Sequence, residues 1–206
     1  MEHIVPESLG NWEHTLSPGV VCDKCNQYFS RKVEKPVLCS GMFRLLGASR
    51  RVPSKKKKIP DIPCRSECNV PEHRAMGRFL GKIGLEAFLF KVRNLENWNY
   101  MVVNNPFFDP LREYVRFGQG EGWPFFFRPL YPVNAVFHEG KQYYEVLHEY
   151  DVLWTDKDEI FFVVCIHGAE FILNMGERDL SGILEWLRDN SYRSPLYTGK
   201  NAEQTN

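Results

Sequence analysis

The sequence lacks the features that would assign it at once to a membrane, secreted or disordered class. It contains no apolar run near the roughly 18 residues that a membrane span requires, and no secretory signal peptide is recognised at its start. We therefore expect a cytoplasmic protein. Global disorder is excluded because 43% of the 206 residues are hydrophobic and 14% are aromatic, which is enough for a packed core.

Net charge is also absent, since 26 Lys and Arg residues balance 26 Asp and Glu residues. The balance hides an uneven distribution along the chain. Residues 31–65 contain eleven basic residues and only two acids, whereas residues 151–189 contain nine acids and three basic residues. The basic front part of the chain predicts a polyanionic partner.

Cysteine is scarce, but its spacing is informative. Four of the six cysteines form two close pairs, Cys22-x2-Cys25 and Cys64-x3-Cys68. Without a secretory signal, close pairs indicate metal binding or redox chemistry more than a disulfide framework. We expect the other two, Cys39 and Cys165, to be ordinary buried thiols.

Prolines, runs of charge and shifts in composition predict four segments of the chain. These are a compact module at 1–46, a basic, Pro-rich linker at 47–72, an α+β domain at 73–190 and a polar tail at 191–206. Within the first segment, the order is strand, loop, strand and helix, with the helix starting near Asp23 and stopping at Pro36. We expect the last sixteen residues to be frayed.

Residues 73–93 form the strongest predicted helix. Apolar residues recur at alternating four- and three-residue spacing, which places them on one face. Three glycines in this stretch, Gly77, Gly81 and Gly84, predict close approach by a neighbouring element. Arg74, Arg78 and Lys82 form a basic stripe, which we interpret as a solvated face and, secondarily, as a phosphate-binding candidate.

The rest of the α+β domain is expected to be mostly antiparallel sheet. A short helix begins at Asp109-Pro110, an edge strand lies within 123–131, and strands follow at 144–154, 160–166 and 171–173. An amphipathic helix containing Leu180 to Leu187 closes the domain. The aromatic 123–131 stretch would also suit base stacking, but we favour the edge strand.

The sharpest motif lies at the start, where Glu2-His3-Ile4-Val5-Pro6 is followed by Cys22-Asp23-Lys24-Cys25-Asn26. Glu-His-Ile-x-Pro joined to Cys-x2-Cys-Asn about twenty residues later resembles the HNH nucleases of the ββα-metal class, in particular bacterial HNH endonucleases. The resemblance covers roughly residues 2–40. It implies an α+β protein in which an N-terminal ββα-metal module is followed by a helix and a β-rich domain.

The same resemblance implies a set of catalytic residues. His3 would be the general base that takes a proton from water, because a His with a pKa near neutrality suits that task. Glu2 and Asn26 would complete the catalytic set by holding one divalent ion. Their oxygen ligands suit Mg²⁺ or Mn²⁺.

Two departures from the family pattern bear on this hypothesis. The middle Asn of the motif is missing just before the Cys pair, and either Asn11 or backbone groups would have to hold the loop instead. The family's upstream Cys-x2-Cys is also missing, so Cys22 and Cys25 lack two ligands of a structural Zn²⁺ site. Either Cys64 and Cys68 complete it, or the chain is a shortened version, which we favour.

Our main functional hypothesis is a metal-dependent HNH endonuclease that hydrolyses phosphodiester bonds in nucleic acid, with DNA as the expected substrate. Phosphate contacts are expected from a basic segment, with Arg31 and Lys32 as further candidates. That segment comprises Arg50, Arg51, Lys55, Lys56, Lys57 and Lys58. Two alternatives stay open: a non-catalytic nucleic-acid-binding or regulatory protein on a degenerate HNH scaffold, and a protein-interaction module centred on the aromatic sheet.

Overall fold

The computed structural model describes residues 2–11, 13–49, 51–53, 58, 61, 69–93, 104–130, 137–139, 142–144 and 148–196. The N-terminal elements are β1 (Glu2–His3), the 3-10 turn η1 (Glu7–Leu9), β2 (Thr15–Leu16), α1 (Asp23–Phe29), the π-helical segment η2 (Ser30–Glu34), α2 (Lys35–Leu38) and α3 (Gly41–Ser49). The predicted order of strand, loop, strand and helix is therefore confirmed.

The following elements are α4 (His73–Arg93), η4 (Pro106–Phe108), α6 (Asp109–Phe117), β3 (Phe126–Pro129), β4 (Phe137–Glu139), β5 (Gln142–Tyr144), β6 (His148–Trp154), β7 (Ile160–Ile166), β8 (Ala169–Asn174) and α7 (Ser181–Asp189). The α+β class with antiparallel sheets is confirmed. In the described ranges, no helix is long and apolar enough to cross a membrane.

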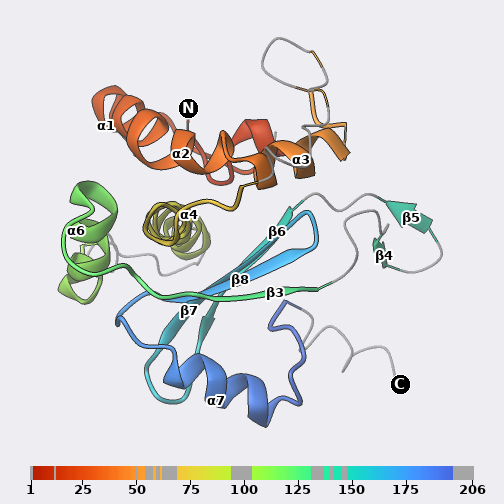
Figure 1. Ribbon diagram of the computed structural model, residues 1–206. Helices are drawn as coiled ribbons and strands as arrows, with labels where there is room; N and C mark the ends of the chain where they lie inside the picture. Colours follow the sequence, from red (N-terminus) through yellow and green to blue (C-terminus); the bar gives the residue numbers. More distant parts are fainter. Residues whose placement is uncertain are drawn as a thin grey trace.

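The central sheet has the strand order β3-β8-β7-β6, with every pair antiparallel. Its β7–β8 turn is formed by His167 and Gly168, both with positive φ, which matches the right-handed twist of the flanking strands. β3 lies at one edge, as predicted from its sequence. Figure 1 shows the layers: α1–α3, then α4 and α6, then the sheet, then α7.

Both faces of the sheet are buried, which explains why β7 and β8 are almost continuously apolar. Alternate residues of each strand point to opposite faces. Phe162 and Val164 pack toward α4, α6 and the N-terminal segment, whereas Phe161 and Val163 pack toward α7. The larger core cluster joins N-terminal residues such as Ile4 with the helices and the sheet, so the N-terminal segment packs against the rest of the fold.

The three glycines of α4 explain how its neighbours approach so closely. A Cβ on Gly77 would lie 2.7 Å from the carbonyl oxygen of Trp123, and one on Gly81 would lie 2.7 Å from Val115 Cγ2. A Cβ on Gly84 would lie 3.0 Å from the ring of Phe162. Each glycine thus admits a different element, which confirms the prediction of close approach.

The basic stripe of α4 is solvated only at Arg74, which is exposed, whereas Arg78 is half-buried and Lys82 is buried. The interpretation as a solvated face is therefore wrong for Arg78 and Lys82, and Lys82 is not available for phosphate. Lys82 is 2% exposed and forms ion pairs with three carboxylates. Arg78 donates to the carbonyl of Val115 at 2.9 Å and to the Tyr28 hydroxyl at 3.2 Å. Arg74 donates to the carbonyl of Gly120. The stripe faces α6 and the N-terminal segment, which the sequence periodicity alone does not reveal.

The helix that follows Cys22 does not stop at Pro36 as predicted, because a π-helical turn precedes the proline. Pro36 lies in the first turn of α2, and the helical path continues to Leu38. Proline has no N–H to donate to the carbonyl four residues earlier. That carbonyl, on Lys32, instead accepts a hydrogen bond from Arg78 at 3.4 Å.

Two further expectations from the sequence need correction. Cys39 is exposed, although Cys165 is buried as expected. In the polar tail, Ser194 donates to the buried Glu170 carboxylate, and Leu196 packs on the α7 side of the sheet. Residues 191–196 therefore belong to the packed structure. The boundaries of the four segments stay a prediction.

Candidate active site in the N-terminal segment

The loop between β1 and β2 is fixed by one buried side chain, Asn11. Its amide nitrogen donates to the carbonyls of Val5 at 2.8 Å and His14 at 3.0 Å. Its amide oxygen accepts from the N–H of His14 at 3.0 Å and of Glu13 at 3.3 Å. Asn11 is 1% exposed, and these bonds satisfy its donors and acceptors. Asn11 therefore fixes the loop that joins β1, the strand of His3, to β2.

His3 lies on β1, opposite Thr15 of β2. Its side chain is half-buried. The Nδ1 atom is sheltered from solvent and has no hydrogen-bond partner among the described residues. Buried polar atoms are nearly always paired, so an unpaired one calls for an explanation. An imidazole nitrogen without a partner is chemically able to accept or donate a proton.

Glu2 precedes His3 on a two-residue strand, so their side chains point to opposite sides. The Glu2 side chain points inward, where its Oε1 atom lies 2.5 Å from Nζ of Lys82. The same ammonium lies 2.7 Å from Oε1 of Glu34 on η2 and 3.0 Å from Oε2 of Glu86 on α4. The structure thus separates the two adjacent residues that the motif presents together.

The ionisation of this cluster is shifted by its burial. For Lys82, burial alone would lower the pKa, but the carboxylates of Glu86, Glu34 and Glu2 raise it above its ordinary value, which keeps the ammonium charged. Burial raises the pKa of Glu86 to about 8, against the opposing effect of Lys82. Lys82 therefore keeps its positive charge across the neutral pH range.

Asn26 lies on the outer side of the segment, in α1. It lines an open hollow of about 360 Å³ with Asp23, Gln27, Ser30 and Arg31. Neither Glu2 nor His3 lines this hollow. The structure therefore does not bring the three predicted catalytic residues together in this hollow.

The positions of Glu2 and Asn26 show whether they could bind the divalent ion that the HNH resemblance implies. Metal ligands of the carboxylate type must be free to face the ion. The Glu2 carboxylate instead faces an ammonium, and within the described ranges no group of three His, Cys, Asp or Glu residues is placed to hold a metal. In this arrangement, Glu2 and Asn26 do not fit a shared divalent ion.

Cys22 and Cys25 begin α1 side by side. Cys22 is the N-cap residue, and its sulfur accepts a hydrogen bond from the N–H of Cys25 at 3.3 Å. This bond, together with the thiol of Cys25, lowers the pKa of Cys22, while the same contact raises the pKa of Cys25. Cys64 and Cys68 lie outside the described residues, so a four-thiolate zinc site stays a prediction.

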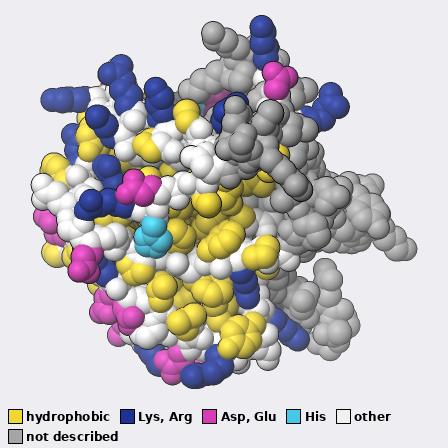
Figure 2. All heavy atoms as spheres, viewed as in Figure 1, with side chains coloured by type: hydrophobic (Ala, Val, Ile, Leu, Met, Phe, Trp, Pro, Cys, Tyr) yellow, Lys and Arg dark blue, Asp and Glu magenta, His cyan; other side chains and the backbone are white. Residues whose placement is uncertain are grey.

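Of the basic residues predicted to contact phosphates, some are described in the structure and others are not. Arg51 and Lys58 are exposed, whereas Arg50 and Lys55, Lys56 and Lys57 lie outside the described residues. Further exposed basic side chains lie along the outer helices: Lys24, Arg31, Lys32, Lys35 and Arg44. Figure 2 shows dark-blue side chains along its upper edge, over the region of α1–α3. We call these five residues the outer basic face.

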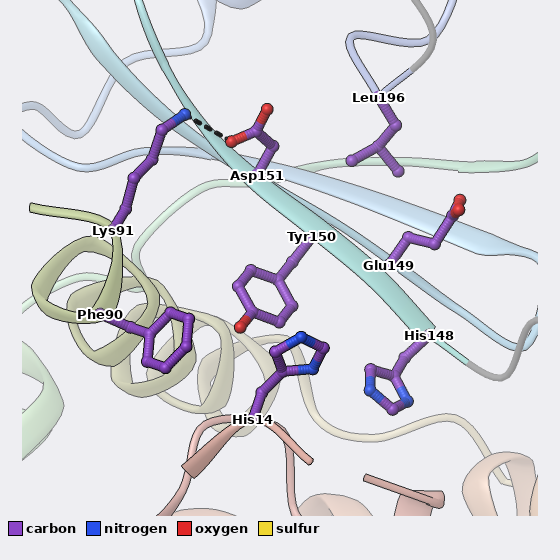
Figure 3. Close-up of a pocket in the computed structure, with 8 residues that line it drawn as sticks. All are labelled: His14, Phe90, Lys91, His148, Glu149, Tyr150, Asp151 and Leu196. Atoms are coloured by element: carbon purple, nitrogen blue, oxygen red, sulfur yellow. Dashed lines mark hydrogen bonds and ion pairs between the residues drawn. The ribbon is translucent and has the colours of Figure 1, made fainter. Parts of the chain in front are cut away.

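A second hollow, of about 470 Å³, lies where the N-terminal segment meets the sheet and contains histidines that the sequence analysis did not connect. His14 precedes β2, and His148 begins β6. Their ring centroids are 6.3 Å apart, and Tyr150 contacts the same His14 ring at 5.5 Å. Figure 3 shows the two imidazoles next to each other, and their planes are nearly perpendicular, at 86°. Because they lie on elements far apart in the chain, no spacing rule relates them.

The environment of this hollow keeps His148 neutral. Burial, assisted by His14, lowers the pKa of His148 to about 4. Burial also raises the pKa of Tyr150 to about 12. Lys91 closes one side of the hollow through its ion pair with Asp151 at 2.6 Å. His14 thus brings the N-terminal segment into contact with β6, and the Lys91–Asp151 pair joins α4 to the same strand.

Comparison with known proteins gives one match. The family model described as HNH endonuclease matches residues 1–39, about a fifth of the chain. No curated protein and no solved structure matches. The matched range contains β1, η1, β2 and the helical path through α2, with Asn11, His3 and Asn26 on it. On this match, residues 1–39 are similar to the HNH endonuclease family.

Proposed function

We propose that this protein hydrolyses phosphodiester bonds in nucleic acid, with DNA as its substrate and His3 as the general base. One observation carries the proposal: His3, the histidine of the Glu2-His3 motif, has a sheltered Nδ1 atom without a partner among the described residues, on a strand fixed to its loop by Asn11. Nδ1 of His14 and of His148 is in the same state, but neither residue belongs to that motif. A general base needs such a nitrogen held in a defined position. The match to the HNH endonuclease model supports the assignment of this chemistry.

The substrate contact is proposed to come from the exposed basic residues. The outer basic face lies on the same helices as Asn26, and Arg51 and Lys58 are exposed nearby in the chain. Lys and Arg bind phosphates irrespective of base sequence. The Lys55 to Lys57 part of the basic run remains a candidate for the same task.

The family implies a divalent ion, Mg²⁺ or Mn²⁺, that supplies a Lewis acid beside the leaving oxygen when it is bound. Because Glu2 and Asn26 do not fit a shared ion in this arrangement, no step is assigned to the ion. The role proposed for His3 is to take the proton of the attacking water. Asn11 maintains the backbone geometry on which that role depends.

The test is a plasmid nicking assay with Mg²⁺, Mn²⁺ or EDTA. We expect His3→Ala to lower metal-dependent cleavage by about 10²–10⁴-fold, because that is what a general base contributes. Binding of the same DNA, measured by fluorescence anisotropy, should be retained. His14→Gln serves as the matched control, because His14 is a second half-buried histidine of the segment. Wild-type rates for His3→Ala would disprove the role of His3.

A second function, nucleic-acid binding without cleavage, is favoured by the ion pair between Glu2 and Lys82. That pair occupies a carboxylate that the family uses in catalysis. The same assay separates the two functions. A wild-type protein that binds DNA but cuts it in none of the metal conditions would establish the second.

A further inference from the structure

The cluster around Lys82 resembles a cation site that already holds its cation. Three carboxylates converge on one ammonium at 2.5, 2.7 and 3.0 Å. They come from β1, η2 and α4, so the cluster joins three elements. The Lys82 side chain is 1% exposed, and the side chains of Glu2, Glu34 and Glu86 are 9%, 13% and 8% exposed.

Charge explains why these carboxyl groups gather at Lys82. An ammonium group has three N–H donors and no acceptor. Lys82 donates a hydrogen bond to Oε1 of Glu2, whereas its contacts with Glu34 and Glu86 are ion pairs, and Oε2 of Glu86 has no hydrogen-bond partner among the described residues. Burying carboxylates is costly unless a positive charge accompanies them. Lys82 therefore supplies the charge and the donors that make the burial of Glu2 and Glu34 tolerable.

The position of Lys82 also bears on whether Glu2 can bind a divalent ion. Its partners are hard oxygen ligands, which are the ligands that Mg²⁺ and Mn²⁺ prefer. One of them, Glu2, is the residue that the HNH resemblance assigns to the divalent ion. A divalent ion at Oε1 of Glu2 would lie beside the Lys82 ammonium, and the two positive charges would repel each other strongly in this nearly solvent-free site. The side chain present in the structure is the ammonium.

We propose that Lys82 is the resident cation of the Glu2, Glu34 and Glu86 carboxylates. Glu2 is then a positioning residue, which anchors β1 to α4, and it is not a ligand of the divalent ion. Since His3 follows Glu2 directly, this anchor fixes the strand from which the general base projects. The inference goes beyond the proposed function and does not depend on cleavage.

The experiment measures Mn²⁺ binding by the full chain, using calorimetric titration and thermal unfolding with and without the ion. Removal of the resident cation in Lys82→Met should leave three carboxylates able to bind Mn²⁺. We expect binding about tenfold tighter than in the wild-type protein, or more, since affinity rises with the number of charged ligands. The gain should disappear in the double variant Glu2→Gln/Lys82→Met. A folded Lys82→Met protein without this gain would overturn the proposal.

A second measurement keeps the proposal testable if Lys82→Met does not fold. The single variant Glu2→Gln should leave the Mn²⁺ affinity of the otherwise wild-type protein unchanged. Loss of Mn²⁺ binding in Glu2→Gln would show that Glu2 is a metal ligand and would reject the resident cation. Both titrations omit nucleic acid, so a failure of the cleavage proposal at His3 leaves their outcome unaffected.

Discussion

The two sides of the N-terminal segment use charge in opposite ways. On the inner side, Glu2 and Glu34 meet Lys82 in a nearly solvent-free cluster that joins the segment to α4. On the outer side, the basic residues of α1–α3 are exposed. Buried ion pairs strongly resist removal of one partner, whereas exposed charges contribute little to stability. The inner charges thus serve the fold, and the outer charges are exposed to solvent.

The largest expected effect that tests this comparison is the loss of Lys82. Lys82→Ala leaves three buried carboxylates without their cation, and we expect the free energy of unfolding to fall by about 3–5 kcal/mol. Lys35→Ala is the matched control, because Lys35 is exposed and its loss should cost within about 0.5 kcal/mol. Urea unfolding of both variants is the measurement. Equal effects would show that the two sides do not differ.

The same comparison shows which features of the structure could be predicted from the sequence and which could not. The alternation in 144–154 predicted a strand that the structure forms over His148–Trp154, and the apolar run 160–166 predicted the next strand, because each strand carries its own pattern. The Glu2-His3 motif indicated the resemblance to HNH endonucleases for the same reason. The partner of Glu2 was missed because Lys82 lies 80 residues away, and a basic stripe at helical spacing looks the same whether it faces water or carboxylates. The proximity of His14 to His148 was missed for the same reason, because these two residues also lie far apart in the chain.

A smaller effect is expected from the glycines that allow close packing on the inner side. In Gly77→Ala, the new Cβ would meet the backbone oxygen of Trp123 at 2.7 Å, and we expect a loss of about 1–3 kcal/mol from overpacking. The control is Gly47→Ala in α3, where a Cβ meets nothing within 4 Å. There alanine should gain up to about 1 kcal/mol through helix propensity. Thermal unfolding of both variants is the readout, and equal melting temperatures would refute the packing argument.

The His14–His148 hollow, also on the inner side, predicts a pH dependence. Burial lowers the pKa of His148 to about 4 in the folded protein, from an ordinary value of 6.5. A lowered histidine pKa means that stability is fully present above pH 6.5 and is lost as the pH falls toward 4. The loss is at most about 1.4 kcal/mol for each pH unit between the two pKa values. Allowing for the partial exposure of the ring, we expect about 1–2 kcal/mol in total.

Denaturant unfolding between pH 7 and pH 4 measures this loss. His148→Phe should lose about 1–2 kcal/mol less stability than the wild-type protein between pH 7 and pH 4. Glu86, whose pKa burial raises to about 8, changes stability in the opposite direction in both proteins, so the difference between the two slopes is the readout. Tyr150→Phe, which alters the same hollow, should keep the slope, because Tyr150 has a pKa of about 12 and does not titrate there. A slope that is the same in wild type and His148→Phe would assign the pH dependence to other groups.

The smallest effect on stability is expected on the outer side, where Arg31 and Lys32 are both exposed. Replacing both with Ala should change the free energy of unfolding by no more than about 0.5 kcal/mol. If they contact phosphates, DNA binding should weaken similarly for all sequences, and the slope of log K against log salt should flatten by about 0.7–0.9 for each phosphate that is no longer neutralised. Replacing Lys55 to Lys58 with Ala tests the basic run in the same titration. An unchanged slope in either variant would show that its residues are solvated and do not contact the nucleic acid.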